Sequence, residues 1–357
     1  MSRICIIGAS NIKHISLISL YTRYFDENSI DYDIIYMDRY GIEEHTNATK
    51  QYRYNVKKIS NKISKLMSFI SFRKFAKGII KEQKYDLIIT WQTTVAYIFA
   101  DLLLRKYKHK YIINIRDYVV EDRLIFKGII RKLIKYSAMN AISSEGFKVF
   151  LPKGDYTRVN SINDDILQNN SFLKNADNHL PYKIGFAGNC RYFKESFRLI
   201  DALANDERFE IWYCGTNSEI LAKYAEEKGI KNVKTMPAFS PSETMKIFSE
   251  FDIVNSAFGN DAMDNSTLMP IRLYTAVSMH LPMLVSDKTQ LAKEVGQAKI
   301  GYVIENYDNL GDKLFSYLET INYNDFSQRC DDYIISAREQ NSLFYDRLGS
   351  IIEVRNG

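Results

Sequence analysis

The residues most able to bind a ligand lie around Pro270 and Arg272. Residues 266–287, STLMPIRLYTAVSMHLPMLVSD, form a mostly apolar run with a single arginine. Proline is well tolerated at the first position of a helix, so we expect a helix that begins at Pro270. Arg272 would then lie in the first turn, where the helix dipole disfavours a cation. A bound anion would stabilise both the helix end and the arginine. The alternative is an ion pair with Asp261 or Asp264.

A second group of cations follows another apolar run. The strand-like sequence YKIGFAG ends at Gly188, and the next loop carries Asn189, Arg191 and Lys194. Two cations beside the start of a helix favour a diphosphate or a similar anion. For each cation taken singly, the alternative is an ordinary solvated side chain. Together with Arg272, these residues predict an anion site in the second half of the chain.

Alternating apolar and helical segments predict the scaffold that positions these residues. Strands are expected at RICIIG, YDIIYMD, DLIITW, YIINIRD and MNAIS, and then at YKIGFAGN, FEIWYCG, NVKTMPAF, DIVNSAF, PMLVSD and GYVIEN. Such alternation is typical of parallel sheets covered by helices on both faces. Ser240, Pro241 and Glu243 have the spacing of a capped helix start. We therefore predict an α/β protein of two tandem doubly wound, Rossmann-like domains, which bind ligands at the carboxyl ends of their strands.

The domain boundaries follow from length and composition. A chain of 357 residues is long for one hydrophobic core and favours two domains. The Asn- and Asp-rich stretch 166–180 is the expected linker. It separates an N-terminal domain, 1–165, from a C-terminal domain, 181–336. The helical segment 337–357 is expected to join the first domain.

The glycine pattern disfavours a dehydrogenase. GASNIK, from Gly8, and GNCRYF, from Gly188, both lack the second and third glycines of a dinucleotide-binding loop. Asp38, at the end of the second predicted strand, has the position of a ribose-binding acid. Without the glycine loop, this acid alone does not predict a nicotinamide cofactor.

The segment from Asn265 through residue 287 resembles the donor-binding segment of GT-B glycosyltransferases, especially family 4 and its relatives in capsule and O-antigen polysaccharide synthesis. In that family two glutamates, separated by seven residues, flank a loop and helix that contain a proline. The end of the segment matches here, with Pro282 before a strand. The two glutamate positions are instead Thr267 and Thr275. The resemblance implies GT-B architecture and transfer of a sugar from a nucleotide diphosphate donor, with UDP-sugars the expected donors.

The resemblance also assigns the donor side. It implies that Arg272 and its helix N-terminus hold the diphosphate, assisted by Arg191 or Lys194. The other predicted donor residues are Gly188, Asn189, Asn265, Thr267, Pro270 and Thr275. No cofactor and no metal ion are expected. The DYD sequence at 31–33, which could suggest a GT-A metal site, begins the second predicted strand and so lies at the wrong strand end.

The first domain would bind the acceptor, which such enzymes take as a glycan on a polyprenyl diphosphate lipid. Inverting transfer needs a carboxylate or histidine near the acceptor hydroxyl. Asp117 is the candidate base, and Glu145 and His14 are further candidates. Arg116 and Arg123 are candidates for holding an acceptor phosphate. Retaining transfer would need no such base and would leave Asp117 a binding role. The structural alternative for Asp117 is a helix cap or an ion pair with Arg116.

Two basic, amphipathic segments suggest a membrane surface. Residues 57–84 carry nine Lys or Arg and one acid, Glu82, with apolar residues at helical spacing. The segment FKGIIRKLIKY repeats the pattern. Basic amphipathic helices suit anionic membranes. The alternative is a core-facing helix with a solvated polar face. The cations predicted to face the membrane are Lys65, Arg73, Lys74, Lys77, Lys127 and Arg131.

Composition limits the remaining possibilities. With 46% hydrophobic and 25% charged residues and a net charge of +5, the chain is typical of soluble globular proteins. No stacking platform or known reader motif predicts nucleic-acid binding. Four cysteines without a CxxC pair and no signal peptide favour a bacterial cytoplasmic protein, peripheral at the inner membrane face. Two alternatives remain: a sugar-nucleotide epimerase of GT-B build, or a non-catalytic GT-B protein that binds a glycan or a partner. The oligomeric state is not predicted.

Overall fold

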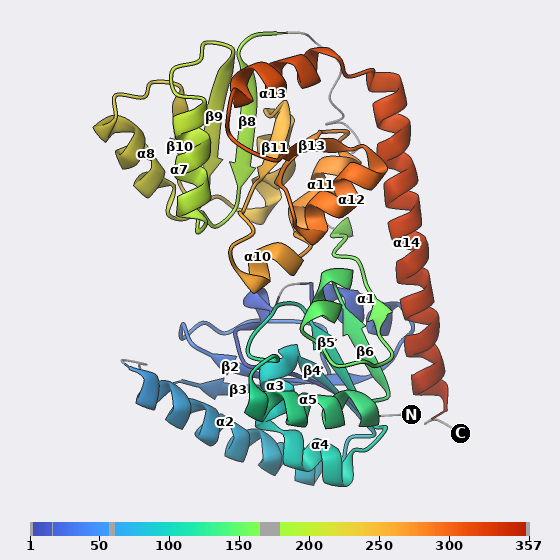
Figure 1. Ribbon diagram of the computed structural model, residues 1–357. Helices are drawn as coiled ribbons and strands as arrows, with labels where there is room; N and C mark the ends of the chain where they lie inside the picture. Colours follow the sequence, from blue (N-terminus) through green and yellow to red (C-terminus); the bar gives the residue numbers. More distant parts are fainter. Residues whose placement is uncertain (1–2, 16, 57–60, 165–178, 355–357) are drawn as a thin grey trace. The chain divides into compact units, whose positions relative to one another are not determined.

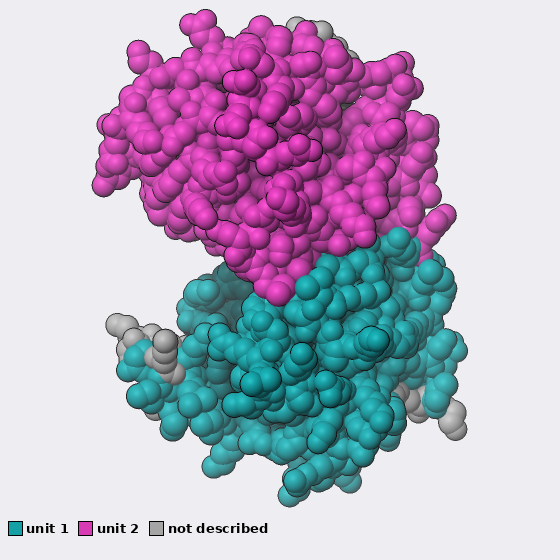
Figure 2. All heavy atoms as spheres, viewed as in Figure 1, with its two compact units in different colours: residues 1–159, 340–357 teal, residues 160–339 magenta. Residues whose placement is uncertain are grey.

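The chain folds into two compact units, each built on one parallel sheet (Figures 1 and 2). The computed structural model describes residues 3–15, 17–56, 61–164 and 179–354. Unit 1 comprises residues 1–159 and 340–357, and unit 2 comprises residues 160–339. The predicted fold class, two Rossmann-like α/β domains in tandem, is confirmed. The predicted linker lies outside the described residues except for its last two positions.

The sheet of unit 1 has seven parallel strands in the order β3-β2-β1-β4-β5-β6-β7. Every residue of the isoleucine-rich strands β1, β2, β4 and β5 is buried, as expected when helices cover both faces. The strands are β1 (Ile4–Gly8), β2 (Tyr32–Asp38), β3 (Lys50–Asn55), β4 (Leu87–Trp91), β5 (Tyr111–Ile115), β6 (Met139–Ile142) and β7 (Thr157–Arg158). The helices are α1 (Ser19–Glu27), α2 (Lys62–Gln83), α3 (Gln92–Ile98), α4 (Ala100–Lys106) and α5 (Leu124–Tyr136), with short 3-10 helices η1 (Ile12–His14) and η2 (Glu145–Val149).

Three details of unit 1 differ from prediction. Strand β3 was not predicted, because its sequence KQYRYN contains no continuous apolar run; it is a partly exposed edge strand. Strand β7 has only two residues and gives no sequence signal. The helix expected from Glu145 is only the short η2, which ends before Pro152. Proline lacks an amide hydrogen and cannot extend such a turn.

The sheet of unit 2 has six parallel strands in the order β10-β9-β8-β11-β12-β13. All six coincide with predicted runs. They are β8 (Tyr182–Ala187), β9 (Phe209–Cys214), β10 (Val233–Met236), β11 (Ile253–Ser256), β12 (Met283–Ser286) and β13 (Gly301–Ile304). The helices are α7 (Phe193–Ala202), α8 (Ser218–Glu227), α9 (Thr244–Ser249), α10 (Met263–Thr267), α11 (Ile271–Ser278), α12 (Gln290–Ala298) and α13 (Leu310–Glu319).

Two predicted helix starts have different outcomes. The capping box is present as predicted: Ser240 accepts from the amide of Ser242, and Glu243 accepts from the amide of Ser240. Pro270, however, is the residue before helix α11, with extended backbone (φ −78°, ψ 149°), and the helix begins at Ile271. Arg272 is still in the first turn of the helix. The prediction that an anion binds at this helix end is therefore not affected by the shift of one residue.

The last helix, α14 (Tyr323–Glu353), belongs to unit 2 up to residue 339 and to unit 1 beyond it. In unit 1 the ring of Phe344 packs edge-on against Tyr21, with 5.3 Å between centroids, and Tyr345 stacks on Tyr24 at 5.4 Å. Arg347 forms an ion pair with Asp155. These contacts attach the end of the chain to helix α1 and to the loop before β7.

Asp38 fixes the carboxyl end of strand β2. Its side chain is 1% exposed and accepts hydrogen bonds from Asn11 at 2.8 Å, from the amides of Tyr40 and Gly41 at 2.9 Å, and from Arg53 at 2.7 Å. Burial alone would raise the pKa of this carboxyl, but these donors outweigh burial and hold the pKa well below its usual range. Because Asp38 is already surrounded by internal donors, the ribose-binding role is not favoured.

We predict that Asp38→Asn lowers the free energy of unfolding at pH 7 by about 2–4 kcal/mol. The substitution weakens these four hydrogen bonds and a fifth from the amide of Ile42, and it leaves Arg53 without the Asp38 counter-charge. The folded pKa lies below the unfolded value of about 4, so the carboxylate stabilises the protein above that pH and loses its effect as the pH falls. Urea unfolding at pH 7 and pH 3 measures both effects. Asp31→Asn, an exposed position in the same unit, is the control. An equal effect of the two variants at pH 7 would contradict the prediction.

Candidate functional site

The candidate site of unit 2 lies where the order of its strands reverses. Strand β8 is flanked by β9 and β11, so the loops after β8 and β11 lead away to opposite sides of the sheet. Ligands of open parallel sheets bind at this point. A pocket of about 320 Å³ occupies it, lined by Arg191, Tyr192, Phe193, Lys194, Glu195, Phe258, Asp261 and Asn265.

Two glycines let the ends of β8 and β9 approach each other. Gly188 and Gly215 have φ values of +132° and +134°, which side-chain-bearing residues rarely adopt. A Cβ on Gly215 would lie 1.9 Å from the carbonyl oxygen of Gly188. A Cβ on Gly188 would lie 3.2 Å from Nη2 of Arg272. The loop after β8 therefore passes directly beside the arginine, as the predicted donor site requires.

Arg272 contacts the ends of both strands at the reversal point. Its guanidinium carbon lies 3.8 Å from the ring centroid of Phe186, on β8, and 5.2 Å from that of Phe258, after β11. Nη1 donates to the carbonyl oxygen of Asn255, on β11, at 3.3 Å. Such placement over aromatic rings is favourable for a guanidinium.

The charge of Arg272 has no carboxylate partner in the described part of the chain. Neither alternative pairing is seen: Asp261 binds Lys194 at 2.7 Å, and Asp264 forms no ion pair with Arg272. Burial lowers the pKa of Arg272 to about 10, so the side chain stays protonated at neutral pH. A half-buried cation without a counter-charge is costly, and a bound anion would relieve that cost.

The other predicted donor residues fall into two groups. Arg191, Lys194 and Asn265 line the pocket itself; Arg191 is exposed and donates to the hydroxyl of Tyr192 at 2.7 Å. Asn265 donates to the carbonyl of Phe258 at 3.0 Å. Asn189 is exposed beside the pocket, where its side chain accepts from Asn217 at 3.0 Å. The structure thus brings together the two cations, Asn265 and Gly188 around one strand reversal.

Thr267 and Thr275 lie differently from what the resemblance implies. Both are 3% exposed, and the hydroxyl of Thr267 donates to the carbonyl of Met263 within helix α10 at 2.6 Å. Thr275 lies in the buried part of helix α11. Neither side chain presents an exposed hydroxyl to a ligand in this structure.

Sequence reasoning missed Glu195, one of the two carboxylates that line the pocket. Glu195, at the start of α7, is 7% exposed and lines the pocket. It accepts from the hydroxyl of Tyr307 at 2.8 Å and from Arg198 at 3.2 Å. The stacked rings of Tyr192 and Phe258, 4.4 Å apart, were also missed. A single glutamate in a helical segment gives no sequence signal, because only the fold brings Tyr307 to it.

The candidate residues of unit 1 follow the carboxyl ends of its strands. Asp117 is exposed after β5 and accepts from Gln92, which follows β4, at 3.1 Å. Glu145, after β6, forms an ion pair with Lys148 at 2.5 Å. His14 is exposed after β1, with its ring 4.9 Å from that of Tyr40. Of the two candidate carboxylates, Asp117 is the one that forms no ion pair with another described residue.

The two predicted acceptor cations lie in different environments. Arg116 is only 7% exposed, with its guanidinium 5.7 Å from the ring of Trp91. Burial weighs against the predicted contact with an acceptor phosphate. Arg123 is exposed and precedes helix α5. Among the described residues, no group of three or more His, Cys, Asp or Glu side chains is placed to hold a metal ion.

The predicted membrane segments expose apolar side chains. On α2, Ile63, Leu66, Met67 and Ile70 are between 52% and 73% exposed, and we call these four residues the α2 ridge. Phe72, Ala76 and Ile80 of the same helix are buried in the core, so the ridge is a separate face. Leu124 and Ile125 are exposed at the start of α5. The ridge is larger than the scattered exposure normal for a surface helix.

Of the six cations predicted to face a membrane, four are exposed and two form ion pairs within unit 1. Lys65, Lys74, Lys127 and Arg131 are exposed. Arg73 and Lys77 instead bind Asp101, at 2.9 and 2.6 Å, so the prediction that they face a membrane is not favoured. None of the helices in the described part of the chain combines the length and the hydropathy needed to cross a bilayer.

No protein-family model and no curated protein matches this sequence. Solved structures do match its fold over nearly the whole chain. WaaG, a glycosyltransferase involved in lipopolysaccharide biosynthesis, is 11% identical, with a TM-score of 0.66, and the match covers 97% of this chain and 99% of WaaG. HepE from Anabaena, in complex with UDP-glucose, is 11% identical, with a TM-score of 0.69 and coverage of 98% and 100%.

An epimerase has the same build. A putative UDP-N-acetylglucosamine 2-epimerase from Listeria monocytogenes is 11% identical, with a TM-score of 0.61 and coverage of 91% of this chain and 90% of that one. At these identities the likeness establishes the fold alone. The chain has the two-domain fold of GT-B glycosyltransferases, as the resemblance implied.

Proposed function

We propose that this protein is a glycosyltransferase that moves a sugar from a nucleotide diphosphate donor, with a UDP-sugar preferred, to a lipid-linked surface polysaccharide intermediate at the cytoplasmic membrane face. The observation that carries the proposal is Arg272, a cation beside the strand reversal of unit 2 that has no carboxylate partner among the described residues. Support for the donor class comes from HepE, which has this fold and binds UDP-glucose.

In this proposal, unit 2 binds the donor. The diphosphate lies against Arg272 and the amino end of α11, with Arg191 beside it. Lys194 contributes less, because Asp261 already compensates its charge. Glu195 offers carboxylate oxygens that can accept from ribose or sugar hydroxyls, beside the contacts they make with Tyr307 and Arg198.

Unit 1 binds the acceptor, and its carboxyl-edge loops supply the chemistry. During transfer, the bond between the anomeric carbon and the β-phosphate oxygen breaks, and a bond to the acceptor oxygen forms. In an inverting reaction the hydroxyl proton passes to Asp117. In a retaining reaction no enzymatic base takes the proton, and Asp117 only binds the acceptor. No metal ion is needed in either scheme, because Arg272 and the helix end stabilise the leaving diphosphate.

The lipid-linked acceptor is proposed from the surface of unit 1. The α2 ridge and the exposed start of α5 would insert into the interface of an anionic membrane, while Lys65, Lys74, Lys127 and Arg131 bind its headgroups. WaaG, which has this fold, is a glycosyltransferase of lipopolysaccharide biosynthesis. The protein would thus be peripheral at the inner membrane face.

Two other functions are each favoured by one observation. An epimerase is favoured by the Listeria structure, which has the same fold. A non-catalytic glycan- or partner-binding protein is favoured by the burial of Thr267 and Thr275 where the resembled family has glutamates.

Arg272→Met is expected to raise the Kd for UDP by about tenfold or more, because it removes a charge-assisted contact to the diphosphate. Methionine keeps the apolar contact with Phe186, so the fold should persist. Isothermal titration calorimetry measures the change. Arg338→Met, an arginine of the same unit that binds Asp164 instead, should bind UDP as the wild type does. An unchanged Kd in the Arg272 variant would exclude its diphosphate role.

Release of UDP from a UDP-sugar should require a polyprenyl diphosphate-linked glycan. A panel of UDP-sugars, with and without this acceptor, tests all three functions in one coupled assay. Turnover or sugar interconversion without acceptor would indicate the epimerase, and binding without turnover would indicate the non-catalytic protein.

In an inverting reaction, Asp117→Asn should lower kcat by about 100-fold or more. In a retaining reaction the loss should be mainly in acceptor KM.

Leu66→Gln combined with Met67→Gln should weaken binding to vesicles of phosphatidylglycerol and phosphatidylcholine by about tenfold or more, since two apolar side chains no longer insert. Vesicle co-sedimentation gives the partition constant. The control is Ile335→Gln combined with Leu343→Gln, which replaces two exposed apolar residues of α14. Equal partitioning of the two double variants would contradict membrane docking through the α2 ridge.

A further inference from the structure

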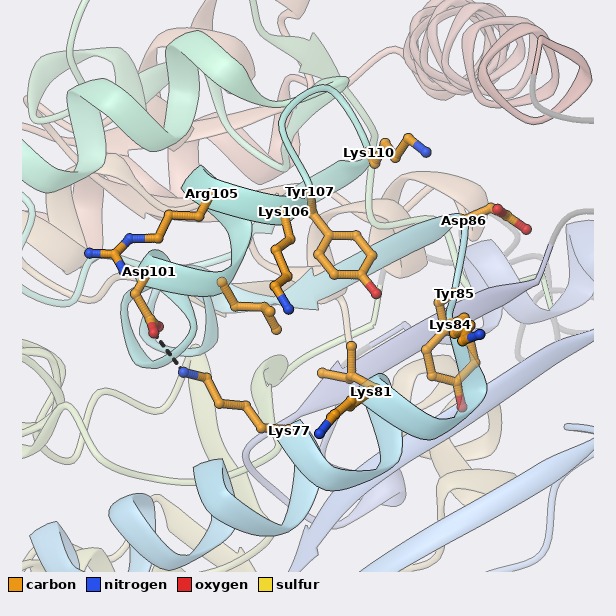
Figure 3. Close-up of a pocket in the computed structure, with 12 residues that line it drawn as sticks. Lys77, Lys81, Lys84, Tyr85, Asp86, Asp101, Arg105, Lys106, Tyr107 and Lys110 are labelled. Carbon is orange, nitrogen blue, oxygen red and sulfur yellow. Dashed lines mark hydrogen bonds and ion pairs between the residues drawn. The ribbon is translucent and has the colours of Figure 1, made fainter.

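A second pocket, in unit 1, concentrates positive charge away from the predicted catalytic residues. Its volume is about 700 Å³, and six of its lining side chains are cationic: Lys77, Lys81, Lys84, Arg105, Lys106 and Lys110. Figure 3 shows side chains from α2 and α4 extending around a common space. We call this cavity the basic pocket.

The basic pocket lies at the amino-terminal edge of the sheet. Lys84 directly precedes Tyr85 and Asp86, which lead into β4, and Lys110 directly precedes β5. Helices α2 and α4 both end there. Asp117, after β5, lies at the opposite, carboxyl edge of the same parallel sheet. The basic pocket is therefore separate from the proposed site of transfer.

The two carboxylates of the pocket do not balance its cations. Asp101 is held by Lys77 at 2.6 Å and by Arg73 at 2.9 Å, so its charge is already compensated. Asp86 accepts from the backbone amide of Arg3 at 3.0 Å. Within the described residues, the other five lining cations form no ion pair with a carboxylate. They are Lys81, Lys84, Arg105, Lys106 and Lys110.

Helix dipoles account for only part of this clustering. The carboxyl ends of α2 and α4 attract cations such as Lys81 and Lys106. Each helix end carries roughly half a negative elementary charge, so the two ends offset about one of the five positive charges. The remaining like charges repel one another around a shared cavity, and an anion bound there would lower that repulsion.

The rest of the lining limits the class of ligand. Ile80, Tyr85, Leu102 and Tyr107 add apolar and aromatic surface beneath the cations. Five of the six cations are lysines, which bind phosphate as flexible point charges. A volume of about 700 Å³ lies within the range of small-molecule sites. This combination suits a compact ligand with both a phosphate group and an organic part, rather than an extended polymer.

We propose that the basic pocket binds a phosphate-bearing organic ligand, independently of the donor site. Two sources have this chemistry: the headgroup of an acidic phospholipid, and a soluble phosphorylated metabolite. In either case the bound phosphate is held by the cations of α2 and α4 and by Lys110. The proposal does not depend on the transfer reaction or on the α2 ridge.

The test uses Lys81→Gln combined with Lys106→Gln, which removes one cation from each helix without placing a negative charge at a helix end. Pyrophosphate is the soluble probe, measured by isothermal titration calorimetry. Vesicles of phosphatidylglycerol are the lipid probe, measured by co-sedimentation against phosphatidylcholine vesicles. The matched control is Lys246→Gln combined with Lys293→Gln, two exposed cations of unit 2. Thermal unfolding checks that both double variants remain folded.

If the ligand is soluble, we expect pyrophosphate affinity to fall by about tenfold or more in the pocket variant and to stay constant in the control. If the ligand is a lipid headgroup, we expect the same loss of affinity for phosphatidylglycerol vesicles. Either loss should shrink as salt rises, because the contacts are screened. If both probes bind the pocket variant and the control alike, the proposal is overturned.

Pyrophosphate bound at the donor site of unit 2 does not affect the comparison between the pocket variant and its control. The pocket variant leaves Arg272 intact, so any pyrophosphate bound in unit 2 is common to the variant and the control. Conversely, Arg272→Met should retain pyrophosphate binding at the basic pocket. An unchanged Kd for UDP in Arg272→Met overturns the donor-site role alone, and unchanged binding of both phosphate probes in the pocket variant overturns the basic-pocket proposal alone.

Discussion

The position of Arg272 is the constraint on which the arrangement of unit 2 depends. Its guanidinium lies between the ends of β8 and β11, against the rings of Phe186 and Phe258, where a Cβ on Gly188 would crowd it. Gly215 also lacks a Cβ, which would collide with the carbonyl oxygen of Gly188. The local backbone, the aromatic stack and the start of α11 thus surround one cation. No carboxylate in the described part of the chain pairs with it, which is the strongest indication of an anionic ligand.

In unit 1 the strands around β1 follow the same order as those around β8 in unit 2. At the corresponding strand ends of unit 1, however, side-chain carboxylates of the unit itself bind the loop amides. Glu44 accepts from the amides of Ile12 and Lys13, both at 2.7 Å, in the turn after β1. Asp38, at the end of β2, is surrounded by internal donors. A phosphate at this turn would meet two carboxylates rather than free amides. The equivalent strand ends therefore differ: carboxylates of unit 1 bind the loop amides and Arg53, whereas Arg272 of unit 2 has no carboxylate partner among the described residues.

How far the sequence predicted the structure depends on whether a feature is local. The buried runs of β1, β2, β4 and β5 follow from continuous apolar segments, the strands of unit 2 from mostly apolar segments between helical ones, and the capping box at Ser240 from a four-residue pattern. Strand β3 is an edge strand with polar residues, so no apolar run marks it. The cations beside the strand reversal were also predictable, since they directly follow strand-like runs.

Features made by long-range contacts were not predictable. The pairing of Glu195 with Tyr307 joins residues far apart in sequence, and the neutralisation of Arg73 and Lys77 by Asp101 joins two helices. The basic pocket likewise needs α2, α4 and the loop before β5 to meet.

The diphosphate role of Arg272 can be tested by a crystal structure of the protein with UDP. We expect diphosphate oxygens within hydrogen-bonding distance, about 3 Å, of the Arg272 guanidinium. UDP bound elsewhere, with Arg272 free of phosphate, would contradict it.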